Sequence, residues 1–121
     1  MAYQRPPFNP DSLTAARLAT GLSRAAVAEQ LGVSRSRVHA WERGDNAPLP
    51  RHLTALAKVL GITPTSLVEG SSLRSRRYAA GLTQAEASTA VGVDRAEWSR
   101  WESGLRIPHR HADAVERLVG G

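Results

Sequence analysis

The sequence predicts an all-α protein built from two tandem small helical bundles. A segment written GVSRSRVHAWERG at residues 32–44 returns as GVDRAEWSRWESG at residues 92–104. Apolar residues recur three and four positions apart, which is the spacing of one helix face. Strand-type alternation is not visible in the sequence. Residues that start and end helices flank each short apolar stretch, so we expect several short helices in each copy.

The repeated unit is much longer than these two segments. Leu13 to Pro48 aligns without a gap with Leu73 to Pro108, an offset of 60 residues. A repeat of this length that occurs twice is typical of a duplicated domain, not of a solenoid. Beyond the loop the offset becomes 59, and the second copy has no equivalent of ITPTSLVEG at residues 62–70. We expect a flexible arm at 1–10, one domain at 11–70 and a truncated second domain at 71–121.

The helices of the first copy follow from their end signals. Side chains that can cap a helix N-terminus precede the first three expected helices: Asp11 or Ser12, Ser23 and Ser34. Glycines that can adopt positive φ follow them: Gly21, Gly32 and Gly44. We therefore expect helices at about 12–20, 24–31, 35–43 and 51–60. Their inward residues are Val27, Leu31, Val38, Trp41, Leu53, Leu56 and Leu60.

The second copy carries two further start signals. Thr83-x-x-Glu86 and Asp94-x-x-Glu97 both have the spacing of a capping box, in which each side chain accepts a backbone N–H of the other residue. We expect both boxes to form. Trp98 and Trp101, like Trp41 in the first copy, fall at inward helical positions and are expected in the cores.

Composition excludes several classes of protein. The net charge is +5 and the isoelectric point about 11.0, which favours a polyanionic partner, nucleic acid before membrane. There is no cysteine, no apolar run of membrane-spanning length and no signal-peptide core, so we expect a cytoplasmic protein without disulfides. His109 and His111 lack a third ligand, and no nucleophile motif is present. We expect no metal, no cofactor, no small-molecule ligand and no enzymatic activity.

Two helices joined by a tight glycine turn make the helix-turn-helix pattern. The turn requires a small residue four positions before its glycine and an apolar residue six after it; Ala28 with Val38 and Ser88 with Trp98 meet this requirement. The segments GLSRAAVAEQLGVSRSRVHAWERG and GLTQAEASTAVGVDRAEWSRWESG resemble the Cro-like phage-repressor family, of the xenobiotic-response-element type. The resemblance covers residues 12–60 and 72–119 and implies lambda-repressor-like helix-turn-helix domains.

The resemblance implies that the third helix of each domain enters the major groove of double-stranded DNA. The base-reading positions of the family fall on Arg35, Ser36 and Ala40 and on Arg95, Ala96 and Arg100. We expect Arg37 and His39 to join them in the first copy, and Glu97 in the second, where its carboxylate can accept from cytosine N4. The phosphate-contacting positions fall on Ser23, Arg24, Arg43, Thr83, Gln84, Arg106 and Arg110. Two structural ion pairs are also implied, Arg17 with Glu42 and Arg77 with Glu102. Arginine suits guanine, whose O6 and N7 accept both donors of its guanidinium.

We therefore expect a sequence-specific DNA-binding transcriptional regulator, in its simplest form a repressor that occupies its operator. The alternative is an antitoxin or adaptor module in which one copy binds a protein partner. Asp94 and Glu97 lie beside Arg95, so the second copy is either a second DNA reader or a packing or dimerisation module. The sequence leaves open whether the chain forms a homodimer, and whether the two half-sites are inverted or direct.

Overall fold

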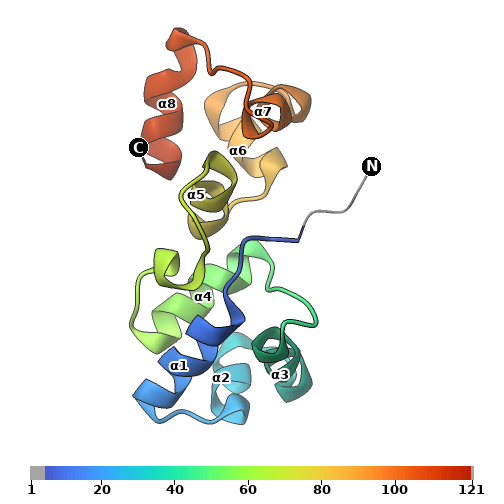
Figure 1. Ribbon diagram of the computed structural model, residues 1–121, viewed down its shortest axis with the longest axis vertical. Helices are drawn as coiled ribbons and strands as arrows, with labels where there is room; N and C mark the ends of the chain where they lie inside the picture. The colour runs from blue at the N-terminus through green and yellow to red at the C-terminus, as the bar shows by residue number, and fades with distance from the viewer. Residues whose placement is uncertain (1–4, 121) are drawn as a thin grey trace.

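The computed structural model describes residues 5–120 and is all-α, as the sequence predicts (Figure 1). The first bundle contains α1 (Pro10–Thr20), α2 (Arg24–Leu31), α3 (Arg35–Arg43), α4 (Pro50–Leu60) and the short 3-10 helix η1 (Pro64–Leu67). The second contains α5 (Leu73–Ala79), α6 (Gln84–Val91), α7 (Arg95–Glu102) and α8 (His109–Val119). None of these helices, within residues 5–120, has the length and apolar character needed to cross a membrane.

Most of the expected helix ends are confirmed. The side chains of Ser23 and Ser34 accept the backbone N–H of the residue three positions later, at 3.0 and 3.1 Å. Gly32, at φ +72°, ends α2 in the left-handed conformation that permits the tight turn into α3. The Thr83–Glu86 capping box forms in both directions, at 2.9 and 3.1 Å.

Two expected helix starts differ from the structure. The cap of α1 is Asn9, not Asp11 or Ser12, because its side chain accepts the N–H of Ser12 at 3.2 Å and α1 begins at Pro10. Proline at the first helical position lacks only an N–H that has no partner within the helix, and its φ suits the helix. The Asp94–Glu97 box is only half formed. Asp94 accepts the N–H of Glu97 at 2.7 Å, but the Glu97 carboxylate accepts from Arg100 instead, at 2.6 Å.

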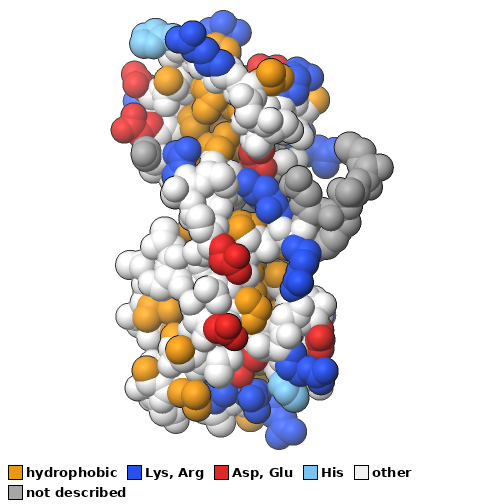
Figure 2. Space-filling model, in the orientation of Figure 1, with side chains coloured by type: hydrophobic (Ala, Val, Ile, Leu, Met, Phe, Trp, Pro, Cys, Tyr) orange, Lys and Arg blue, Asp and Glu red, His pale blue; other side chains and the backbone are white. Residues whose placement is uncertain are grey.

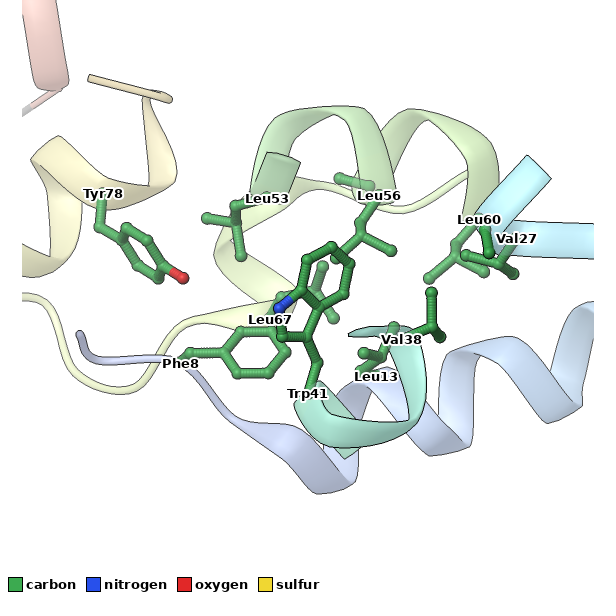
Figure 3. Packing of buried hydrophobic residues seen from close by; sticks show 12 residues of the cluster. Phe8, Leu13, Val27, Val38, Trp41, Leu53, Leu56, Leu60, Leu67 and Tyr78 are labelled. Carbon is green, nitrogen blue, oxygen red and sulfur yellow. The ribbon is translucent and has the colours of Figure 1, made fainter. Parts of the chain in front are cut away.

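Each bundle encloses its own hydrophobic core, and the three tryptophans are buried as expected. In the first bundle Trp41 lies at the centre of the core, beside Phe8, Leu56 and Leu67 (Figure 3). In the second bundle the ring centroids of Trp98 and Trp101 lie 5.7 Å apart, and both rings pack with Leu73, Ala87 and Val115. The small residues Ala28 and Ser88 are buried, so each second helix packs closely on the third.

Residues 5–9 do not form the flexible arm that we expected. Phe8 is 6% exposed, belongs to the first core and pairs with Val68 in an isolated antiparallel bridge. The N–H of Asn9 donates to the carbonyl of Leu67 at 2.9 Å, and that of Glu69 donates to the carbonyl of Pro7 at 2.7 Å. Burial of the phenylalanine ring removes apolar surface from water and orders the segment. Residues 1–4 of the expected arm lie outside the described residues, and Pro10, its last residue, begins α1.

The two bundles are in direct contact through α5, which packs against α4 and η1. Tyr78 of α5 is buried and extends toward the first core, beside Phe8 and Leu53 (Figure 3). Its hydroxyl donates to the carbonyl oxygen of Pro48 at 2.6 Å. The side chain therefore belongs to the second domain by sequence and to the first core by packing.

Candidate nucleic-acid interface

The exposed face of α3 carries the expected base-reading residues of the first domain. Arg35, Ser36, Arg37 and His39 are exposed and Ala40 is half-buried. Val38 lies on the opposite face and is fully buried, which fixes the rotation of the helix about its axis. No carboxylate forms an ion pair with Arg35 or Arg37 within residues 5–120, so both guanidinium groups can meet an external anion.

The start of α2 lies beside this face. A shallow depression connects the two elements, and the residues lining it are Arg17, Ser23, Arg24, Ala25, Arg35 and His39. The structure thus brings two expected phosphate-contacting residues together with two expected base-reading residues. The N-terminus of α2 adds the partial positive charge of a helix end, which favours a phosphate.

In the second domain α7 has the same placement but a different charge. Arg95, Ala96 and Arg100 are exposed and Glu97 is half-buried. Arg100 Nη2 donates to Glu97 Oε2 at 2.6 Å, so this pair presents no net charge. Arg95 forms no ion pair within residues 5–120. The exposed surface of α7 is therefore less positive than that of α3.

A groove beside the start of α7 joins residues of both domains. The second domain contributes Arg74, Arg77, Tyr78, Thr83, Gln84, Ala85 and Arg95, and the first contributes Pro6, Pro7 and Pro50. The expected phosphate-contacting residues Thr83 and Gln84 thus lie together with the expected base-reading Arg95, as their counterparts do in the first domain.

A buried ion pair supports each third helix from within. In the first domain Arg17 Nε donates to Glu42 Oε2 at 2.5 Å and Arg17 Nη2 to Oε1 at 3.1 Å. Arg24 Nε adds a third bond to Oε1 at 3.0 Å. Burial by itself would raise the pKa of Glu42, but the hydrogen bonds and charges of Arg17 and Arg24 hold it below its ordinary value.

The second domain repeats this arrangement with two changes. Arg77 donates to Glu102 through Nε at 2.5 Å and Nη2 at 3.2 Å. In place of Arg24, Gln84 Nε2 donates at 2.9 Å, and Trp98 Nε1 also donates at 2.6 Å. Burial would raise the pKa of Glu102, and these donors together with the Arg77 charge lower it.

The expected phosphate-contacting residues differ in how free their side chains are. Arg24 and Gln84 each donate to a buried glutamate, and Arg43 lies 3.5 Å from Asp45. Arg106 and Arg110 are exposed, in the loop after α7 and in the first turn of α8. Figure 2 shows Lys and Arg side chains gathered at the lower right, over α3, and at the top, where α8 begins.

Within residues 5–120, no group of three or more His, Cys, Asp or Glu side chains is placed to hold a metal ion. Sequence reasoning missed the residues that join the two domains, chiefly Tyr78. The signal was present: Tyr78 stands where the first copy has Leu18, although both neighbouring positions, Arg77 and Ala79, resemble their counterparts Arg17 and Ala19. A large change at one position of a repeated helix marks a different environment.

Comparisons with known proteins agree with this geometry. Residues 13–67 match a family model described as helix-turn-helix, and residues 70–120 match a second model described as helix-turn-helix domain. The chain is also similar to the HTH-type transcriptional regulator DicA of Escherichia coli (strain K12), with 40% identity over 48 residues. That segment is 40% of this chain and 36% of DicA, so the similarity spans little more than a third of the relative. No solved structure matches the chain.

Proposed function

Because the chain carries two tandem helix-turn-helix domains, we propose that it is a sequence-specific double-stranded DNA-binding transcriptional regulator. In the simplest form it represses transcription by occupying its operator. The proposal needs neither a cofactor nor catalysis, and it places the protein in the cytoplasm, at the nucleoid when bound to DNA. A homodimer is not required, because one chain carries two DNA-binding units.

The observation that carries the proposal is the exposed face of α3. Arg35 and Arg37 project from a helix whose buried side is fixed by Val38, and no carboxylate within residues 5–120 neutralises them. The adjacent N-terminus of α2, with Ser23 as its cap, is suited to a phosphate. In this proposal Arg35, Ser36, Arg37, His39 and Ala40 contact bases, and Ser23, Arg24 and Arg43 contact the backbone.

The second domain contributes the second half of the site. In the proposal, α7 contacts bases through Arg95, Ala96, Glu97 and Arg100. Glu97 can accept from the N4 amino group of cytosine, so its charge is compatible with base recognition. The backbone contacts are assigned to Thr83, Gln84, Arg106 and Arg110.

The test is selection from a random duplex library at about physiological salt, followed by affinity measurements on the selected DNA. Arg35→Ala and Arg37→Ala should each weaken binding by about 5- to 150-fold, the range for loss of one bidentate base contact of about 1–3 kcal/mol. Lys58→Ala is the matched control, since Lys58 is exposed near the far end of α4 and carries the same charge. It should leave affinity for the selected DNA nearly unchanged.

The second candidate function is a protein-interaction module, and the neutral Glu97–Arg100 pair on α7 is the observation in its favour. The salt dependence of binding separates the two. Specific DNA binding should weaken steeply as salt rises, with a slope of about −0.9 per phosphate neutralised. If no motif is selected and Arg35→Ala binds DNA as tightly as the unsubstituted chain, the DNA-binding proposal fails.

A further inference from the structure

The two domains contact each other through non-equivalent surfaces. The second domain contributes the C-terminal part of α5 and the turn after it, through Tyr78 and Gly81. The first domain contributes the loop before α4 and the first turns of α4, through Pro48 and Thr54. Tyr78 donates to the Pro48 carbonyl at 2.6 Å, and a Cβ placed on Gly81 would lie only 2.7 Å from Thr54 Cγ2.

The reciprocal contact does not form. At the offset of the repeat, the counterpart of Tyr78 is Leu18 and that of Gly81 is Gly21. Leu18 is 64% exposed, and a Cβ placed on Gly21 would meet no atom within 4 Å. The surface that joins the second domain to the first therefore faces solvent on the first domain. The contact is heterologous, as in a head-to-tail assembly.

This asymmetry bears on the DNA that the pair can fit. Inverted half-sites are related by a two-fold axis, and a pair of domains that reads them with equivalent helices must share that axis. A two-fold axis makes every contact occur twice, with residue i touching j and j touching i. Direct-repeat half-sites are related instead by rotation and translation along the duplex, which a heterologous contact accommodates.

The relative placement of the domains is braced at a second point. Arg5 Nη2 donates to the carbonyl of Gly44 at the end of α3, and the carbonyl of Arg5 accepts from Arg74 of α5. Pro6 and Pro7 border both the end of α3, at Arg43, and the start of α7, at Arg95. Two grooves beside this segment thus extend to the two third helices, one to Arg43 and the other to Arg95.

We infer that the two domains recognise half-sites arranged as a direct repeat, because the contact that joins them is made in one direction only. The inference rests on the proposed function and gives it an operator geometry. It departs from the inverted half-sites expected for two domains related by a two-fold axis.

The test uses a chain in which both domains present the same exposed residues. The substitutions Ala96→Ser, Glu97→Arg, Ser99→His and Arg100→Ala give α7 the exposed residues of α3 and leave the buried Trp98 in place. The reciprocal graft on α3 is Ser36→Ala, Arg37→Glu, His39→Ser and Ala40→Arg, with Val38 retained. Each grafted full-length chain, and the unsubstituted chain in parallel, is taken through selection from a random duplex library. Circular dichroism checks folding, and native mass spectrometry identifies the complexes with one chain per duplex.

In one-to-one complexes, each graft should select the same short sequence twice in the same orientation. The grafted chain should bind a probe with that direct repeat at least about 10-fold more tightly than a probe in which one of the two halves is inverted. The inference is overturned if the grafts select an inverted repeat or a single half-site, or if DNA is bound only by two chains that each use one domain. It is also overturned if neither graft selects a motif while the unsubstituted chain does. If the unsubstituted chain itself selects no motif, the proposed function fails.

Discussion

Replacement of Glu42 by glutamine tests whether the buried ion pair supports the first domain. The Glu42 side chain is 3% exposed and that of Arg17 is 9% exposed, so water cannot replace the lost partner. Glutamine keeps the shape of the side chain but removes the negative charge. It also turns one acceptor into an NH2 group that faces a guanidinium.

The magnitude follows from the three hydrogen bonds that the carboxylate accepts, two from Arg17 and one from Arg24. Arg24 is 41% exposed and regains water on losing its partner, so most of the cost comes from Arg17. Breaking a buried pair by removing one partner costs about 3–5 kcal/mol. Against a typical domain stability of about 5–15 kcal/mol, that loss is a large fraction.

The effect of this substitution should depend on pH. The folded pKa of Glu42 lies below its ordinary value, because Arg17 and Arg24 outweigh the effect of burial. The pair therefore contributes stability that is fully present above the unfolded pKa of about 4.3 and is lost as pH falls through the folded value. The difference between the unsubstituted chain and Glu42→Gln should be largest near pH 7 and should shrink below about pH 4.3.

The assay is urea unfolding followed by tryptophan fluorescence and circular dichroism at pH 7 and at several lower pH values. Glu29→Gln is the matched control, because Glu29 is exposed on α2 and the charge change is the same. Joint replacement of Arg17 and Glu42 by apolar residues should recover much of the loss. A loss below about 1 kcal/mol at pH 7, or a loss that does not change with pH, would refute the reasoning.

Three further predictions concern the domain contact and α7. Gly81→Ala and Gly21→Ala both place a side chain at positive φ, at a cost of about 1–2 kcal/mol, but only Gly81 faces Thr54. Gly81→Ala should therefore lower the melting temperature more, and Thr54→Ala should recover the difference; equal losses would contradict the contact. Tyr78→Phe should cost about 1–3 kcal/mol in urea unfolding, because it leaves the buried carbonyl of Pro48 without its donor; a neutral result would show that the carbonyl is hydrated. Glu97→Ala frees Arg100 and should tighten binding to non-specific duplex DNA and steepen its salt dependence in fluorescence anisotropy; an unchanged affinity would place α7 away from the phosphates.

Local signals in the sequence predicted most of the helices and both cores. Ser23, Ser34 and Thr83 cap the helices that they were expected to cap, because capping depends on residues only three positions apart. The errors came where two local partners compete. Asn9 was overlooked in favour of Asp11 or Ser12, and Glu97 bonds to Arg100 instead of completing a capping box.

The segment of residues 5–9 could not be predicted in the same way. Its order depends on Phe8, which enters a core made by helices far along the chain, and on a bridge to Val68. A single apolar residue among prolines gives no periodic signal. The expected interface residues remain predictions from resemblance, although the structure groups Ser23, Arg24, Arg35 and His39 around one depression and Thr83, Gln84 and Arg95 around another.

The sequence by itself determined that the chain is all-α, that it contains one domain twice, and which residues differ between the two third helices. These properties depend on local spacing and on a comparison of the chain with itself. Only the tertiary structure decided how the two domains meet. The contact between Tyr78 and Pro48 joins residues 30 positions apart. It forms because α5 of the second domain packs on α4 and η1 of the first. Repeat periodicity makes the two copies look interchangeable, whereas a contact made once, in one direction, gives them different places in the molecule.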